Sequence, residues 1–109
     1  MIDKELADKV VALGVGAYDA GERHHAYWVD GHEWMDAWAF VCDWRVVGEL
    51  MEKCQKMYVE YIGEPEQTVY ARAENNRTWD WPVGENLPRL IVEACVEALT
   101  GTWVAQSDD

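Results

Sequence analysis

Arginine and aromatic side chains recur side by side in this chain, and together they are suited to hold an aromatic anion. Tyr70 and Arg72 alternate along one predicted extended segment, and Arg77 alternates with Trp79 and Trp81 along the next. Aromatic rings stack on nucleobases, while a guanidinium group forms strong, paired hydrogen bonds with phosphate. If the two segments pair, one sheet face or edge carries all five side chains and forms a candidate nucleotide site. The structural alternative is that the two Trp side chains simply cover the sheet.

A predicted helix N-terminus offers a second place for an anion. Arg45 follows Trp44 at the start of this helix, where free N–H groups and the helix dipole favour negative charge. Arg89 lies near the start of a later helix, and its structural alternative is an ion pair with Glu93, four residues along. The candidate ligand-binding residues are therefore Trp28, Trp44, Arg45, Tyr70, Arg72, Arg77, Trp79, Trp81 and Arg89.

Histidine and carboxylate side chains cluster in one short segment that contains His24, His25, His32 and Glu33. Imidazole and carboxylate groups are ligands for zinc or non-haem iron, so this cluster would serve a metal-assisted hydrolase. Its spacing matches no strong template, because no second His follows Glu33 at the HExxH spacing. Solvated loop histidines are the default interpretation, and we predict no metal ligand here.

Nucleophilic catalysis has little support in the sequence. The only serine is Ser107, near the end of the chain, while Cys42, Cys54 and Cys95 fall on positions predicted to be packed. A buried thiol has a raised pKa and is inert. Gly-x-Ser-x-Gly, Walker and GxGxxG motifs are all missing from the sequence. We therefore predict no catalytic residue and no cofactor, and we favour a binding protein over an enzyme.

Composition narrows the class of partner. The chain has 109 residues, a length typical of one domain, and a formal net charge of −12. This acidity excludes duplex DNA or RNA, because no basic excess neutralises phosphates, but it tolerates a small anion near the few arginines. No apolar run approaches the roughly 18 residues that would span a membrane. The first residues lack signal-peptide features, and an odd number of cysteines without a CxxC pair is typical of a cytoplasmic protein.

Helices are predicted where apolar residues recur at helical spacing, over 3–13, 44–56 and 87–100. The expected N-cap residues are Asp3, Asp43 and Asn86. The expected left-handed stops are Gly14 and Gly101.

Extended segments are predicted at 58–62 and 68–73, joined by a hairpin loop, and at 77–81. This order of helices and strands indicates an α+β fold. Because 58–62 is apolar on both faces except at Glu60, we expect the sheet to be buried on both sides. The predicted architecture is a three-layer α-β-α sandwich with a small, mainly antiparallel sheet.

An irregular, aromatic-rich arm is predicted at about 15–42, within a single domain over 1–103 that is followed by a polar tail at 104–109. A strand is expected at 25–29, and a short helix or irregular structure at 33–42. The arm carries more large aromatic residues than local burial accounts for, namely Trp28, Trp34, Trp38 and Phe40. Packing of this arm on a neighbouring subunit would bury them, so a homo-oligomer is predicted.

Two helical segments give the chain a family resemblance. The stretch Asp43-Trp44-Arg45-Val46-Val47-Gly48-Glu49-Leu50-Met51-Glu52-Lys53-Cys54 and the later stretch 85–99, with its Asn-Leu-Pro-Arg entry, resemble the phage ABA sandwich family, as does the hairpin between them. The resemblance covers roughly residues 43–101 and implies an α-β-α layered fold and a phage or prophage origin. It implies no general activity and no catalytic residues, and it does not reach residues 14–42.

These patterns together favour a non-enzymatic phage or prophage accessory protein that binds and sequesters a small anionic ligand. The resemblance leads us to expect a nucleotide-type host immune signal, such as a cyclic nucleotide or an ADP-ribose derivative, bound by a homo-oligomer in the cytoplasm of an infected bacterium. One alternative is an acidic protein-binding module that inhibits a host defence protein through its Trp residues. The other is the metal-assisted hydrolase of the His/Glu cluster.

Overall fold

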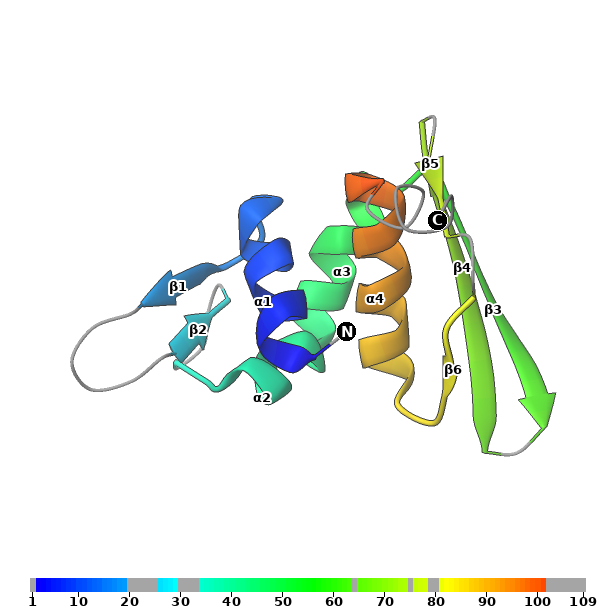
Figure 1. The fold of residues 1–109 in the computed structure, drawn as a ribbon, viewed down its shortest axis with the longest axis horizontal. Coiled ribbons are helices and arrows are strands. Elements are labelled where there is room, and N and C mark those ends of the chain that lie inside the picture. Colours follow the sequence, from blue (N-terminus) through cyan, green and yellow to red (C-terminus); the bar gives the residue numbers. More distant parts are fainter. Residues whose placement is uncertain are drawn as a thin grey trace.

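Helix α4 (Leu87–Thr100) lies at the centre of the structure, between a sheet and the other helices (Figure 1). The structure is a computed structural model that describes residues 2–19, 26–29, 34–63, 65–74, 76–78 and 81–101. A helix with neighbours on both sides must be apolar nearly all round, and the buried residues of α4 are Leu90, Ile91, Val92, Ala94, Cys95, Val96, Glu97 and Ala98.

The ends of α4 follow the sequence prediction. The Asn86 side chain accepts a 3.4 Å hydrogen bond from the Arg89 N–H and caps the helix. Pro88 lies in the first turn, where its missing N–H costs little. Gly101 ends the helix with a φ of 67°, in the left-handed region.

Three further helices pack beside α4: α1 (Asp3–Ala12), α2 (Ala37–Val41) and α3 (Trp44–Lys53). Asp43 caps α3 as expected, because its Oδ1 accepts from the Arg45 N–H at 2.8 Å. The N-cap prediction for Asp3 is wrong, since Ile2 is the N-cap and no side chain caps α1. Helix α3 ends at Lys53, short of the predicted residue 56, because the chain is already extended at Cys54.

The larger sheet is antiparallel and is built around its central strand, β4 (Glu66–Ala73). Strand β3 (Lys56–Gly63) pairs with one edge of β4. Strands β5 (Asn76–Arg77) and β6 (Val83–Gly84) pair with its other edge. Of the predicted extended segment at 77–81, Arg77 lies in β5, Thr78 and Trp81 lie outside the strands, and residues 79 and 80 lie outside the described residues.

A second, two-stranded sheet lies at the opposite end of the molecule (Figure 1) and consists of β1 (Ala17–Asp19) and β2 (Ala26–Trp28). The chain enters β1 through Gly16, whose φ is +71°. A Cβ at this position would lie 2.4 Å from the Trp28 carbonyl oxygen and 2.8 Å from the Phe40 ring. The small sheet and α2 therefore approach the backbone here too closely for any larger residue.

The predicted α+β class is confirmed: four helices combine with two small antiparallel sheets in the described part of the chain. The described helices lie on one side of the larger sheet (Figure 1). The complete three-layer α-β-α order stays a prediction. None of the helices in the described ranges is long and apolar enough to cross a membrane.

Strand β3 differs most from the sequence-based expectation. We expected 58–62 to be buried on both faces, but the side chains of Tyr58, Val59, Tyr61 and Ile62 are exposed. The reason is strand order, because β3 pairs with β4 alone among the described strands and α4 packs on β4, β5 and β6. The apolar pattern indicated burial, but this strand at the edge of the sheet has no described helix over its side chains, so they stay exposed.

The aromatic residues of the expected arm divide between core and surface. Phe40 and Tyr27 are fully buried, with ring centroids 5.2 Å apart. Placing Phe40 in an intersubunit interface was therefore wrong, because it belongs to the core of its own chain. Trp34 and Trp38 are exposed, and the half-buried Trp28 ring lies 6.3 Å from the Trp34 ring.

Candidate ligand-binding face

The face of the larger sheet turned away from α4, which we call the outer face, carries the chemistry that the sequence predicted for the paired segments. Even-numbered residues of β4 point to this face. Thr78 identifies the opposite, inner face, because its hydroxyl donates a 3.0 Å hydrogen bond to the Ala94 carbonyl of α4. Thr78 lies beside Ala71, so the odd-numbered residues of β4 face the helix. Residues directly opposite each other in an antiparallel pair share a face. Register therefore determines which side chains meet on the outer face.

One row of the outer face is cationic. Arg72 lies opposite Lys56 of β3 and opposite Arg77 of β5. We call Lys56, Arg72 and Arg77 the cationic row; all three are exposed. Three neighbouring cations in a chain of net charge −12 make a local positive region, and beyond about 8 Å the remaining charge is screened by physiological salt.

The next row is aromatic. Tyr58 lies opposite Tyr70, with ring centroids 5.8 Å apart, and the Trp81 ring lies 5.1 Å from Tyr70 on the other side. We call Tyr58, Tyr70 and Trp81 the aromatic row. Its outer members keep 49% and 39% of their surface exposed, for Tyr58 and Trp81 respectively. Flat rings at this exposure are available to stack on a ligand.

The two rows touch through Lys56 and Tyr58. The Lys56 Nζ lies 5.2 Å from the centre of the Tyr58 ring, within the range of a cation–π contact. A hydrogen bond with Tyr58 raises the pKa of Lys56, against the opposing effect of the nearby Arg72 charge. The ammonium group is therefore held charged beside the aromatic row.

A depression of about 430 Å³ opens beside the aromatic row and is lined by Tyr58, Val59, Glu60 and Trp81. Glu60 lies on the far side of the aromatic row from the cations, opposite Thr68. Along the outer face, positive charge is followed by neighbouring aromatic rings and then by a carboxylate. A ligand with an anionic group, a flat ring and hydrogen-bond donors matches this order.

Two threonines that the sequence did not indicate as functional position the segments of the outer face that carry Trp81 and Arg77. The Thr68 hydroxyl donates a 2.9 Å hydrogen bond to the Pro82 carbonyl and so fixes the segment that carries Trp81. Thr78 is buried, and its hydroxyl accepts from the Ala71 N–H at 3.0 Å, which fixes the end of the strand that carries Arg77. Only the alternation of polar residues in this region pointed to them.

Trp44 and Arg45 lie elsewhere, at the start of α3. The Trp44 side chain is exposed, while the Arg45 guanidinium bonds Asp43 through Nε at 3.0 Å and Nη2 at 2.7 Å. Because Asp43 also caps the helix, its carboxylate already occupies the place that we proposed for an anion. The neighbouring depression is lined by Arg45 and Gly48 and by two carboxylates, of Glu49 and Glu52, which is unfavourable for negative charge.

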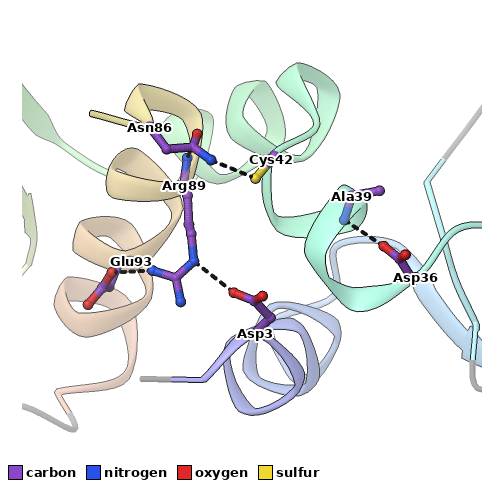
Figure 2. Close-up of polar contacts among 7 residues, drawn as sticks. All are labelled: Asp3, Asp36, Ala39, Cys42, Asn86, Arg89 and Glu93. Atoms are coloured by element: carbon purple, nitrogen blue, oxygen red, sulfur yellow. Dashed lines mark hydrogen bonds and ion pairs between the residues drawn. The ribbon is translucent and has the colours of Figure 1, made fainter. Parts of the chain in front are cut away.

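Arg89 connects two helices (Figure 2). Its Nε donates to Asp3 Oδ1 at 2.8 Å and its Nη1 donates to Glu93 Oε2 at 3.0 Å, so that α1 is tied to α4. Nearby, the Asn86 amide donates to Cys42 Sγ at 3.1 Å, and Asp36 caps α2 through the Ala39 N–H. This geometry matches the structural alternative for Arg89 and separates it from the outer face.

The remaining candidates do not join the outer face. Trp28 belongs to β2 of the small sheet, at the other end of the molecule (Figure 1). Trp79 and the four residues considered for the alternative metal site, His24, His25, His32 and Glu33, lie outside the described residues. Within the described ranges, no group of His, Cys, Asp and Glu side chains is arranged to hold a metal ion.

All three cysteines were predicted to occupy packed positions, and this prediction is confirmed most clearly for Cys95. This thiol is buried in α4, and both a hydrogen bond with Cys54 and burial raise its pKa. A thiol so held is a poor nucleophile. Cys42 and Cys54 are partly buried.

Comparison of the chain with protein-family models, with curated proteins and with solved structures finds no match. The resemblance to the phage ABA sandwich family therefore stays a prediction.

Proposed function

We propose that this protein binds a nucleotide-type anion on the outer face of its larger sheet and releases it unchanged. The observation that carries the proposal is the aromatic row, Tyr58, Tyr70 and Trp81, beside the cationic row, Lys56, Arg72 and Arg77. Stacking surfaces next to guanidinium groups are the combination that recognises a base and its phosphate together.

The spacing of the rows supports this kind of ligand. Residues that share a face of one strand lie about 7 Å apart along it, as Tyr70 and Arg72 do. This distance suits a ligand whose flat ring and anionic group are joined by a sugar. The ring stacks against Tyr58 or Trp81, Arg72 and Arg77 bind the phosphate, and Glu60 accepts hydrogen bonds from the base or sugar.

Sequestration of a host immune signal, such as a cyclic nucleotide or an ADP-ribose derivative, is the narrower form of the proposal. It depends on the resemblance to small phage proteins. The outer face itself supports only the wider class, an anion joined to an aromatic ring.

Equilibrium dialysis with ADP-ribose and with a cyclic dinucleotide tests the proposal. We expect at least one of them to bind, and we expect Arg72→Gln to weaken binding about tenfold or more, because it removes charge-assisted hydrogen bonds. Arg45→Gln is the matched control, since Arg45 lies off the outer face, and it should bind as the wild type does. Mass spectrometry of the heat-released ligand should return it intact.

Two results would contradict the proposal. One is that neither compound binds the wild-type protein. The other is that Arg72→Gln and Arg77→Gln bind as tightly as the wild type, which would place the site elsewhere. A degraded ligand would instead favour the hydrolase.

A further inference from the structure

Strand β3 presents an apolar edge on the surface of the larger sheet. Its side chains at Tyr58, Val59, Tyr61 and Ile62 are between 42% and 73% exposed, and they belong to both faces of the strand. Proteins usually cover or pair such an edge, because it offers unpaired backbone groups together with apolar surface. Figure 1 shows β3 as the strand farthest from the helices.

The hydrogen bonds of β4 determine which backbone groups of β3 face outward. The Thr78 N–H donates to the Ala71 carbonyl at 2.9 Å, and the Ala71 N–H donates to the Thr78 hydroxyl. Ala71 therefore turns its backbone groups toward β5. Successive residues of a strand turn these groups to alternate sides, so Tyr70 and Arg72 turn theirs toward β3.

The same alternation applies on β3. Tyr58, opposite Tyr70, turns its N–H and C=O toward β4. Met57 and Val59 then turn theirs to the open edge, where no other described strand pairs with them. A second strand that binds β3 must therefore bond to Met57 and Val59.

The side chains of β3 are complementary to a second, antiparallel copy of the same strand. With a two-fold axis at Tyr58, Lys56 of each copy lies opposite Glu60 of the other, and Met57 lies opposite Val59. Two opposite-charge pairs and two apolar pairs result, each favourable across neighbouring strands. The two Tyr58 residues face each other at the centre.

Backbone geometry permits this register, and the charge pairs distinguish it from its neighbours. With the axis at Tyr58, Met57 of one copy and Val59 of the other are directly opposite and exchange hydrogen bonds, as their outward groups require. The pairs involve residues 56–60, and the bulge between Tyr61 and Gly63 begins only beyond them. Moving the axis to Val59 would pair Lys56 with Ile62 and Tyr58 with Glu60, and both charge pairs would be lost.

We propose that two copies of this chain associate through β3, antiparallel and centred on Tyr58, so that their larger sheets form one continuous sheet. The charge pattern of β3 points to a second copy as the occupant of this edge, and the outward backbone groups of Met57 and Val59 are placed to bond it. Closed two-fold dimers with self-complementary surfaces are the commonest oligomers. The aromatic rows of both copies then meet at the two Tyr58 rings on the outer face. This proposal does not depend on any ligand.

Charge reversal tests the register directly. Lys56→Glu places two pairs of like charges across the axis, and so does Glu60→Lys, so each variant should weaken the dimer about tenfold or more. The double variant Lys56→Glu/Glu60→Lys restores opposite charges and should return the dimerisation constant to near the wild-type value. Sedimentation velocity over a range of concentrations, without nucleotide, measures all four proteins.

A backbone variant tests the edge independently of charge. Val59→Pro removes an N–H that faces the open edge and that β4 does not use, so the chain should keep its fold and lose the dimer. Val59→Thr keeps the N–H and is the matched control, which should still dimerise. Circular dichroism shows whether each variant is folded.

Three results would overturn this proposal. These are a wild-type monomer at all concentrations, a double charge variant no tighter than the single variants, or a folded Val59→Pro protein that dimerises as Val59→Thr does. Each of these results can occur whether or not the outer face binds a nucleotide. Failure of the dimer proposal is therefore distinguishable from failure of the proposed nucleotide binding.

Discussion

The hydroxyl of Tyr27 donates a 2.6 Å hydrogen bond to Oδ1 of Asp8 and so connects β2 of the small sheet to α1. Asp8 also accepts a 2.9 Å hydrogen bond from Lys4, one helical turn before it. The Tyr27 ring is buried against Phe40, so this contact joins a packed ring to a half-exposed carboxylate. It explains how a three-residue strand far from the larger sheet is held against the helices.

Tyr27→Phe should lower the free energy of unfolding by about 1 kcal/mol at pH 7, because it removes this hydrogen bond and keeps the packed ring. Urea unfolding, followed by far-UV circular dichroism, measures the change. Tyr61→Phe is the matched control, because Tyr61 is 73% exposed, and it should unfold at the wild-type midpoint. Equal midpoints for all three proteins would show that the Asp8 contact adds nothing to stability.

The same contact predicts how stability depends on pH. The hydrogen bonds from Tyr27 and Lys4 lower the pKa of Asp8, so its contribution is present above the unfolded pKa, near 4, and is lost as pH falls through the folded pKa. Burial and the Asp8 contact raise the pKa of Tyr27, so its contribution is complete below about pH 10 and is lost above it. Urea midpoints measured from pH 3 to pH 11 should fall at both ends, and Tyr27→Phe should lose most of the alkaline decline. A variant that declines as steeply as the wild type above pH 10 would assign the alkaline decline to other groups, such as the buried Cys95 thiol.

Thr78 should matter more to stability than a short polar side chain usually does. Thr78→Val keeps the shape but removes the hydroxyl that bonds to Ala71 and Ala94. It leaves buried polar groups without a partner, so we expect a loss of about 1–3 kcal/mol. Thr78→Ser keeps the hydroxyl and should lose less. Urea unfolding distinguishes them, and a Val variant as stable as the Ser variant would show that these hydrogen bonds contribute little.

The helices and the central strand could be predicted from the sequence because their information is local. Capping by Asp43 and Asn86, the stop at Gly101 and the alternation along 68–73 each involve residues close together in the chain. Such patterns set backbone conformation over a few residues. The sequence also predicted that Tyr70, Arg72 and Arg77 would share one face if their two segments paired, and Arg72 does lie opposite Arg77.

Strand order and long-range polar contacts could not be predicted in this way. An apolar strand such as 58–62 indicates burial, but local pattern does not tell whether β4 or β3 is central. The position of Trp81 depends on the bond from Thr68 to the Pro82 carbonyl, between residues far apart in sequence. The Arg89 bond to Asp3 joins opposite ends of the chain, and the i, i+4 pattern indicated only its Glu93 partner.

Arg89 is predicted to serve stability rather than binding. Arg89→Met should lower the free energy of unfolding by about 1–3 kcal/mol, because Asp3 and the partly buried Glu93 lose a charged hydrogen-bond partner. Nucleotide binding should not change. Urea unfolding and equilibrium dialysis on the same sample measure the two effects. An Arg89→Met variant that is as stable as the wild type but no longer binds nucleotide would show that Arg89 belongs to the ligand site. It would contradict the role in stability proposed here.

Three glycines should respond differently to the same added methyl group. At Gly16, with a positive φ, Ala would place its Cβ 2.4 Å from the Trp28 carbonyl oxygen, so both backbone strain and collision oppose it. At Gly14, with a φ of +87° and nothing within 4 Å, only the strain remains, which costs about 1 kcal/mol. At Gly48, inside α3 with open space, Ala should stabilise the protein by about 0.5–1 kcal/mol. Thermal unfolding should therefore rank Gly48→Ala above the wild type, Gly14→Ala below it and Gly16→Ala lowest. If Gly14→Ala and Gly16→Ala were equally stable, the close approach of the small sheet to residue 16 would be disproved, because backbone strain is common to both positions.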